Sequence, residues 1–250
     1  MNRHQFLAPR NLLLAAFLAF PWTSATRLNG ATGDFHGCPP EGSKSKSAKD
    51  RLQKPEEKCK QIDCDLNRLK NRDEPPDSYE TLALKEILDN KPEQAQAVGK
   101  RDRSKWTPQA KAEVEKWERL GASVEGFLLA MKHEGPERCN CKSDQFKDYH
   151  LWLGAAPVQK KSELKKAKKS AQVMEISPRV LEKHAEWDPK LLSKLVRDKT
   201  KVRISGWLMW DQEHPEQSGK SRGTLWEVHP IHKIEFEKTG SFVSLNQEHP

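Results

Sequence analysis

Six acidic and imidazole side chains near the C-terminus could bind a divalent metal or transfer protons. They are Asp211, Glu213, His214, Glu227, His229 and His232. Glu227 and His229 stand two positions apart in an extended segment, so they point to the same side and form the candidate catalytic pair. Asp211 and His214 are the candidate metal ligands. No established metal-binding spacing is matched, so we expect no metal or cofactor, and the ordinary alternative is polar surface between two strands.

Tryptophan is the second residue type whose placement suggests a function. Four of the eight tryptophans lie in segments that alternate like strands. Trp210 and Trp226 share their side with aliphatic residues, which predicts that they lie in a core. Trp152 and Trp207 lie on the opposite side, where exposed indoles would form a stacking platform for bases or sugars. The alternative is that these two pack beneath a helix.

A lysine-rich segment follows one of these tryptophans. Residues 158–171 (VQKKSELKKAKKSA) hold six lysines and one glutamate. The candidate ligand-binding lysines are Lys160, Lys161, Lys165, Lys166, Lys168 and Lys169. Lysine carries a mobile point charge that suits non-specific contact with phosphate groups. The alternative is a solvated loop without a ligand.

Five cysteines are candidates for disulfide bonds: Cys38, Cys59, Cys64, Cys139 and Cys141. In an oxidising compartment they would pair and leave one over. Cys59 and Cys64 could close a small loop, or either could pair with Cys38. A bond between Cys139 and Cys141 would close a strained ring, whereas pairing with an earlier cysteine would join the N-terminal region to the later part of the chain. Zinc is the weaker interpretation, because with His150 these two give only three ligands.

The elements that must position these residues come in a recognisable order. Alternating patterns predict strands over 122–135, 149–154 and 172–180, then a helix capped by Asp188, then strands over 201–211 and 223–237. This β-β-β-α-β-β order is that of a five-stranded OB-like barrel, a mainly β fold with some α. A helix capped by Thr107 precedes the barrel and ends at Gly121. Gly126 predicts a bend or bulge in its strand. Pro230 has no N–H to donate to a neighbouring strand, so it predicts an edge strand or a bulge.

The chain divides into four regions by composition. Residues 1–25 resemble a signal peptide, with Arg3 and Arg10 preceding a ten-residue apolar core that is too short to span a bilayer. An uncleaved anchor or a buried helix is the alternative. Residues 26–104 predict a mostly disordered linker or tail with short helices. Residues 105–240 form the OB-like domain, and residues 241–250 a flexible C-terminus. No second long apolar segment follows, so we expect no transmembrane segment in the mature chain.

Four segments resemble a family of exported bacterial proteins that have no assigned activity and an OB-like C-terminal domain. The segments are LNRLKNR, GFLLAMKHEGPERCNC, DYHLWL and GWLMWDQEHPEQSGKSRGTLWEVHP. The resemblance covers roughly residues 62–75 and 106–237. It implies export and the barrel fold, and it brings no catalytic or binding residue.

The net charge and the absence of common motifs reduce the number of candidate functions. The net charge of +8 slightly favours acidic partners. The chain has no glycine-rich phosphate loop, GxSxG, HExxH or paired CxxC, which argues against common NTPases, serine hydrolases and zinc proteases. We expect a secreted or periplasmic, non-catalytic OB-fold protein that binds nucleic acid or another polyanion. The alternatives are an envelope protein-interaction module and a metal-dependent hydrolase.

Overall fold

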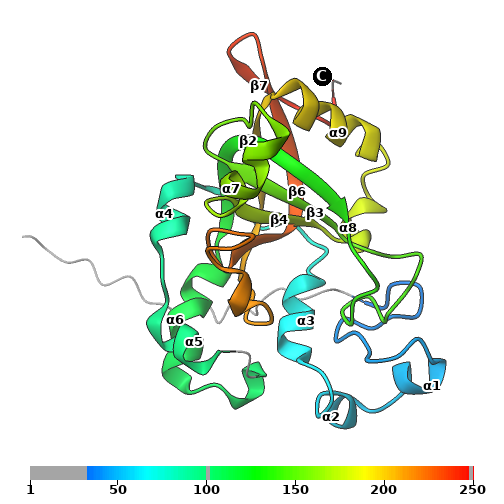
Figure 1. The fold of residues 1–250 in the computed structure, drawn as a ribbon. Helices are drawn as coiled ribbons and strands as arrows, with labels where there is room; N and C mark the ends of the chain where they lie inside the picture. Colours follow the sequence, from blue (N-terminus) through cyan, green and yellow to red (C-terminus); the bar gives the residue numbers. More distant parts are fainter. Residues whose placement is uncertain (1–32, 100–101, 248–249) are drawn as a thin grey trace, which may run out of the picture.

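Five strands form a closed barrel in the computed structural model, which describes residues 33–99, 102–247 and 250 (Figure 1). The barrel strands are β2 (Gly121–His133), β3 (Tyr149–Gly154), β4 (Gln172–Ile176), β5 (Lys201–Trp210) and β6 (Trp226–Lys238). Strand β2 pairs antiparallel with β3 and β5, and β4 pairs parallel with β6, which closes the sheet. With helix α9 (Pro189–Asp198) between β4 and β5, the predicted OB-like fold class is confirmed.

The barrel interior holds the side chains that the strand alternation predicts to be buried. In β5 and β6 these include Val202, Ile204, Leu208, Trp210, Trp226, Val228, Ile234 and Phe236. The rings of Trp210 and Trp226 meet edge to face, with their centroids 5.2 Å apart. The prediction that these two tryptophans belong to the core is therefore confirmed.

Strand β6 is irregular at Pro230, as its missing N–H predicts. The register between β5 and β6 shifts on both sides of Gly206. A Cβ atom on Gly206 would lie 2.2 Å from the carbonyl oxygen of Pro230, so this close approach requires glycine. The irregularity in β2 lies between Leu128 and Ala130 instead of at Gly126, which pairs regularly with Val202.

Two capped helices lie at opposite ends of the barrel (Figure 1). The hydroxyl of Thr107 accepts a hydrogen bond from the amide of Ala110 and caps α6 (Pro108–Glu118), as predicted. Asp188 caps α9, which buries Leu192 and Leu195 in the core. The shorter helices of this region are α7 (Leu164–Lys168), α8 (Pro178–Leu181), η2 (Lys161–Glu163) and η3 (Pro215–Gln217).

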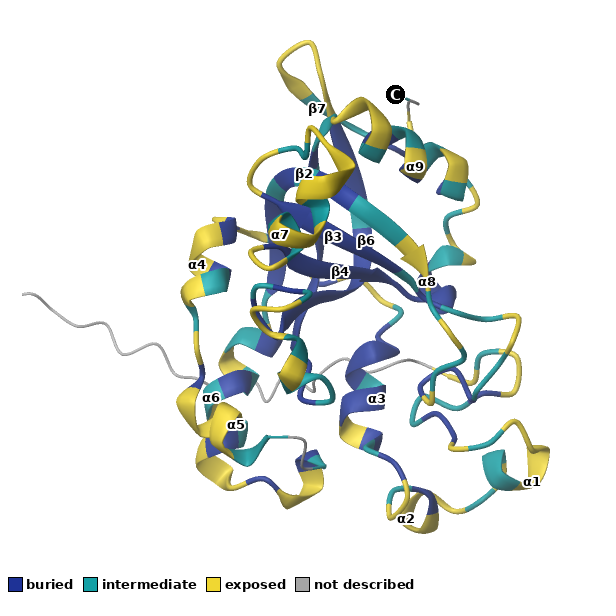
Figure 2. Cartoon of the chain, in the orientation of Figure 1, coloured by how far each residue is buried: buried dark blue, intermediate teal, exposed yellow. Residues whose placement is uncertain are grey.

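The region before α6 folds against the barrel. Its elements are α1 (Ala48–Arg51), α2 (Pro55–Lys58), α3 (Cys64–Lys70), β1 (Glu80–Leu82), α4 (Leu84–Asp89), α5 (Glu93–Val98) and η1 (Arg103–Lys105). The predicted short helices are present. The prediction of a mostly disordered tail over 26–104 is wrong for its described part, because Leu82, Leu84 and Ile87 are buried in the common core and α3 is largely buried (Figure 2). Each segment is too short to bury its apolar side alone, and the barrel supplies the missing surface.

Arg72, just after α3, anchors this region to the barrel. Its guanidinium is buried and donates to the carbonyl oxygens of Leu69, Glu118, Leu208 and His229 at 2.7–3.3 Å. Burial lowers the pKa of Arg72 to about 9, so the side chain is still protonated at neutral pH. One side chain thereby joins α3, α6, β5 and β6.

Two disulfide bonds confirm two of the pairings considered. Cys38 is bonded to Cys141 across 103 residues, and Cys59 is bonded to Cys64 across five. Cys139 is the cysteine left over, and it is buried. The longer bond joins the N-terminal region to the loop between β2 and β3.

The C-terminal segment adds a strand. Strand β7 (Ser241–Ser244) pairs antiparallel with β6, and Leu245 is buried in the core. The prediction of a flexible C-terminus over 241–250 is therefore wrong up to at least residue 245. The predicted signal peptide lies outside the described residues. In the part of the chain that the structure describes, the helices are too short or too polar to cross a membrane.

Candidate functional site

An acid–histidine cluster occupies the outer face of the barrel. It consists of Asp148, His150, Glu175, Glu227 and His229, all buried. His150 pairs with Glu175 across β3 and β4, and the parallel register of β4 and β6 continues to bring Glu175 beside His229. Alternate residues of the same strands, such as Leu151 and Met174, fill the barrel interior. The cluster is therefore built by side chains that face away from the core and are covered by other segments.

Glu175 lies at the centre of the cluster. Its Oε1 lies 3.1 Å from Nδ1 of His150, and its Oε2 lies 3.1 Å from Nδ1 of His229. Glu227 lies 3.5 Å from the same nitrogen of His229. The two predicted catalytic candidates, Glu227 and His229, therefore do lie on one side of β6 and in contact, but both are fully buried, so a substrate could not reach them in this conformation.

Burial and neighbouring charges set the protonation states of the cluster. Burial, with the charges of Glu137 and Glu175, raises the pKa of Asp148 to about 8. Burial alone would lower the pKa of His229, but the carboxylate of Glu175 outweighs it and raises that pKa to about 10. Burial would raise the pKa of Glu175, yet the charge of His229 holds it well below its usual range. At neutral pH the cluster therefore contains a buried ion pair and a neutral Asp148.

Two cations from outside the barrel strands pair with Glu227 of the cluster and with carboxylates beside it. Arg222 bridges Glu227 and Asp211, with Nη1 3.0 Å from Oδ2 of Asp211. Lys70 of α3 lies 3.1 Å from Glu213 and 3.5 Å from Glu137. These pairs tie the loop between β5 and β6 to α3 and to the loop between β2 and β3.

Asp211 and His214, the candidate metal ligands, are already paired. Nδ1 of His214 lies 2.7 Å from Oδ2 of Asp211, the oxygen that also accepts from Arg222. Burial would raise the pKa of Asp211, but the hydrogen bond with His214 and the charges of Lys70 and Arg222 hold it far below its usual range. The same hydrogen bond raises the pKa of His214. The structure thus brings the two residues together as a polar pair that holds the loop.

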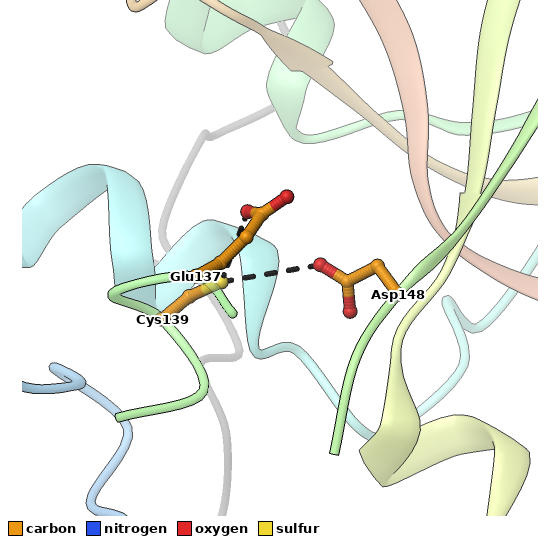
Figure 3. A group of neighbouring side chains, drawn as sticks. All are labelled: Glu137, Cys139 and Asp148. Atoms are coloured by element: carbon orange, nitrogen blue, oxygen red, sulfur yellow. Dashed lines mark hydrogen bonds between the residues drawn. The ribbon is translucent and has the colours of Figure 1, made fainter. Parts of the chain in front are cut away.

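The free thiol of Cys139 faces the cluster from the loop between β2 and β3 (Figure 3). Its Sγ lies 3.5 Å from Oε2 of Glu137 and 4.0 Å from Oδ2 of Asp148. Burial raises the pKa of Cys139 well above its usual range, and both carboxylates add to this effect. The thiol is therefore protonated, and its S–H is placed to donate to a carboxylate.

The expectation that Trp152 and Trp207 are exposed is wrong. Each is 8% exposed, and each indole donates a hydrogen bond to a backbone carbonyl: Trp152 to Ser221 and Trp207 to Glu74. Lys168 lies 3.4 Å from the ring centroid of Trp152, and the guanidinium of Arg72 lies 4.7 Å from that of Trp207. Helix α7 and the N-terminal region cover the outer barrel face, so no stacking platform is open at these two residues.

The candidate lysines form a lysine surface on η2, on α7 and on the residues that flank them, between β3 and β4. Lys160, Lys161, Lys165, Lys166 and Lys169 are exposed, and Lys168 is half-buried against Trp152. Figure 2 shows exposed residues on α7. Among the described residues, none of these six ammonium groups forms an ion pair with a carboxylate, although other surface lysines such as Lys85 and Lys194 do. The surface therefore presents uncompensated positive charge.

A small pocket lies apart from both features. It has a volume of about 180 Å³ and lies between α4, α5 and the loop between β5 and β6. Leu88, Gln96, Trp210, Gln212 and Leu225 are among its lining residues, and no residue of the acid–histidine cluster or the lysine surface lines it.

Comparison with known proteins adds no assignment. No protein-family model, curated protein or solved structure matches this chain. The fold and the geometry of the site are therefore the grounds for a functional proposal.

Asp148 and Glu175 are the site residues that the sequence analysis missed. They lie far from Glu227 and His229 along the chain, and only the strand pairing brings them together. A signal for Glu175 was present, because a glutamate inside the short apolar strand QVMEI must be either exposed or paired. Asp148 directly precedes a strand and carried no comparable signal.

His232 on β6 predicts a loss of stability in acid. Burial, together with the charges of Arg72, His184 and Lys183, lowers its pKa to about 3. The unfolded chain takes up a proton at this histidine below pH ~6.5 while the folded protein does not. The free energy of unfolding should fall between pH ~6.5 and 3 by up to about 1.4 kcal/mol per pH unit from this group. Urea denaturation across this range should show a shallower slope for His232→Gln.

The control for this prediction is His133→Gln at the exposed end of β2, which removes a histidine that is not buried. An unchanged pH slope in His232→Gln, relative to that control, would contradict the assignment.

Proposed function

We propose that this protein binds a polyanion, with nucleic acid as the first candidate, through the lysine surface and without catalysing a reaction. The supporting observation is that five exposed lysines there lack a carboxylate partner among the described residues. Unpaired lysines attract phosphate groups over the distance of a Debye length, about 10 Å at 0.1 M salt. The surface lies beside β3 and β4, the face that OB barrels commonly use for oligonucleotides and oligosaccharides.

Charge, and not base stacking, supplies the attraction in this proposal. Trp152 lies beneath Lys168 and Trp207 beneath Arg72, so neither indole offers an open face. A surface of flexible point charges contacts the phosphate backbone of a nucleic acid and hardly distinguishes one base sequence from another. We therefore expect binding that is weak, sequence-tolerant and strongly dependent on salt.

Export is part of the proposal. Two disulfide bonds suit an oxidising compartment, in agreement with the signal-like residues 1–25. A metal-dependent hydrolase centred on Glu227 and His229 is not supported, because both side chains are closed off from solvent.

The test is a titration of the chain from residue 26 onward with labelled single-stranded DNA, RNA and heparin at two salt concentrations. If all five exposed lysines contact phosphates, affinity should fall about 100-fold between roughly 50 and 200 mM salt. A variant with glutamine at Lys160, Lys161, Lys165, Lys166 and Lys169 should lose most of this salt dependence. Each phosphate contact that is lost should reduce the slope of log affinity against log salt concentration by about 0.7.

The matched control changes five exposed lysines elsewhere to glutamine: Lys44, Lys49, Lys54, Lys105 and Lys116. It alters net charge equally and should retain the affinity of the unmodified chain. Equal losses in the two variants would show that net charge alone matters and would contradict a localised surface. Affinity that is independent of salt, or no binding to any of the three polymers, would contradict the proposal and favour a protein partner.

A further inference from the structure

Three side chains of the acid–histidine cluster converge from three different segments. Asp148 precedes β3, Glu175 lies on β4 and His229 lies on β6. Each offers one ligand atom, and the three atoms lie within 4.8 Å of one another. A single ion could therefore contact all three without a change of the backbone.

The buried imidazole of His229 lacks hydrogen bonds in this arrangement. The side chain is 0% exposed, and neither ring nitrogen has a hydrogen-bond partner. Nδ1 lies 3.1 Å from Oε2 of Glu175, but the two are not aligned for a hydrogen bond. A buried polar atom without a partner is costly, and in native proteins it calls for an explanation. A ligand at the centre of the three residues would supply the partner.

Two carboxyl groups of the cluster, Asp148 and Glu175, form no ion pair with a lysine or arginine among the described residues. Arg222 forms ion pairs with Glu227 and Asp211, and Lys70 forms ion pairs with Glu213 and Glu137. Among the described residues, Glu175 pairs only with the histidines, and Asp148 accepts a hydrogen bond from the amide of Asn140 but forms no ion pair with a lysine or arginine. A divalent cation held by these carboxyl groups and His229 would therefore compete with no lysine or arginine, and it would displace the protons of Asp148 and His229 on binding.

We propose that Asp148, Glu175 and His229 bind a divalent first-row transition metal, with Zn²⁺ as the first candidate. One imidazole nitrogen and two carboxylate oxygens are a donor set that Zn²⁺ accepts, whereas Mg²⁺ and Ca²⁺ prefer oxygen ligands alone. All three side chains are buried, so the metal would have a structural role. It would join β4, β6 and the segment just before β3, and its binding would stabilise the folded chain.

A competing position lies next to this one. Glu137, Cys139 and Asp148 also offer three ligand atoms within 4.8 Å of one another, and the two sets share Asp148 (Figure 3). Lys70 lies against Glu137 in this second set and already supplies a positive charge there. The proposal therefore places the metal on the His229 side of Asp148.

The experiment measures metal binding by the metal-stripped chain from residue 26 onward. Equilibrium dialysis against Zn²⁺ should give one equivalent bound to the unmodified protein. His229→Gln should weaken binding by more than about 100-fold, because it removes a direct ligand and not only an outer-shell contact. Cys139→Ser should leave the affinity close to that of the unmodified protein. His214→Gln is the matched control, since it removes a nearby histidine that lies outside the proposed ligands.

The absorption spectrum of bound Co²⁺ distinguishes the two ligand sets, because only the second set contains a thiol. Co²⁺ bound by carboxylates and imidazole should show visible ligand-field absorption but no thiolate-to-cobalt charge-transfer band. A charge-transfer band that disappears in Cys139→Ser would move the metal to the second set and overturn the proposal. Absence of stoichiometric Zn²⁺ and Co²⁺ binding by the unmodified protein would overturn it as well.

Thermal stability gives a further test. Addition of Zn²⁺ should raise the melting temperature of the unmodified protein and leave that of His229→Gln unchanged. A rise in both proteins would contradict the proposal.

Discussion

Replacement of Glu118 by alanine is expected to lower the free energy of unfolding by about 3–5 kcal/mol, because it leaves the guanidinium of Arg103 buried without its counter-charge. The two side chains form a double hydrogen bond, with Nη1 to Oε2 at 2.7 Å and Nη2 to Oε1 at 2.6 Å. The Arg103 side chain is 7% exposed and that of Glu118 is 1% exposed. Urea denaturation at neutral pH measures the loss.

The pair also satisfies the backbone of β5. Oε1 of Glu118 accepts from the amide of Trp210 at 2.9 Å, and Arg103 donates to the carbonyl of Trp210 at 2.7 Å. Arg103 additionally donates to the side chain of Gln212 at 3.2 Å. Loss of the carboxylate therefore leaves a buried amide unpaired as well as a charge, and each of these carries a penalty.

Two variants separate these contributions. Glu118→Gln keeps the shape and one acceptor, so it should destabilise less than alanine does. Glu115→Ala lies on the same helix, where its carboxylate forms an exposed pair with Arg119, and should change stability by no more than about 0.5 kcal/mol. Equal losses for Glu115→Ala and Glu118→Ala would show that helix propensity, and not the buried pair, is responsible.

Removal of the Cys38–Cys141 bond is the second large effect. The bond closes a loop with a sequence separation of 103 residues. Restriction of the unfolded chain by a loop of this length contributes about 4.7 kcal/mol in the chain-entropy model. The double variant Cys38→Ala/Cys141→Ala, which leaves neither partner unpaired, should lose about this amount in guanidinium denaturation.

The second disulfide provides the control. Cys59 and Cys64 are five positions apart, and the same model gives about 2 kcal/mol for so short a loop. The double variant Cys59→Ala/Cys64→Ala should therefore be clearly more stable than the first. A loss as large in this variant as in the other would contradict the loop-length argument.

Strand positions were predictable because side-chain alternation and capping are local signals. Thr107 and Asp188 cap helices where expected, and β5 and β6 bury the predicted sides. The closure of the barrel followed from the order of the elements alone, since few folds accommodate three strands, a helix and two strands. The irregularity of β6 at Pro230 was also predictable, because a residue without an N–H interrupts the hydrogen bonding between strands.

The covered outer face was not predictable from the same signals. Alternation showed that Trp152 and Trp207 point away from the core, but it could not show that Lys168 and Arg72 lie over them. The residues between 33 and 104 are polar on average, and their buried apolar side chains, such as Leu66 and Ile87, are spread over several short segments. Their contribution depends on contacts with distant strands, which a local pattern does not contain.

The acid–histidine cluster shows the same limit. Glu227 and His229 were placed on one side of a strand by their spacing, and the structure agrees. Their partners are Glu175 on β4 and Asp148 just before β3, and both are brought close by the pairing of β3 with β4 and of β4 with β6. A buried glutamate in a short strand signals that a partner exists but does not say which one.

The Cys38–Cys141 bond also makes a covalent ring of more than a third of the chain. Strands β1 and β2 and helices α1–α6 all belong to this ring. A single protease cut anywhere within it opens the ring without releasing a fragment, so the cut protein should migrate as one species on a gel until a reductant is added. Limited proteolysis read only under non-reducing conditions would therefore report an intact chain.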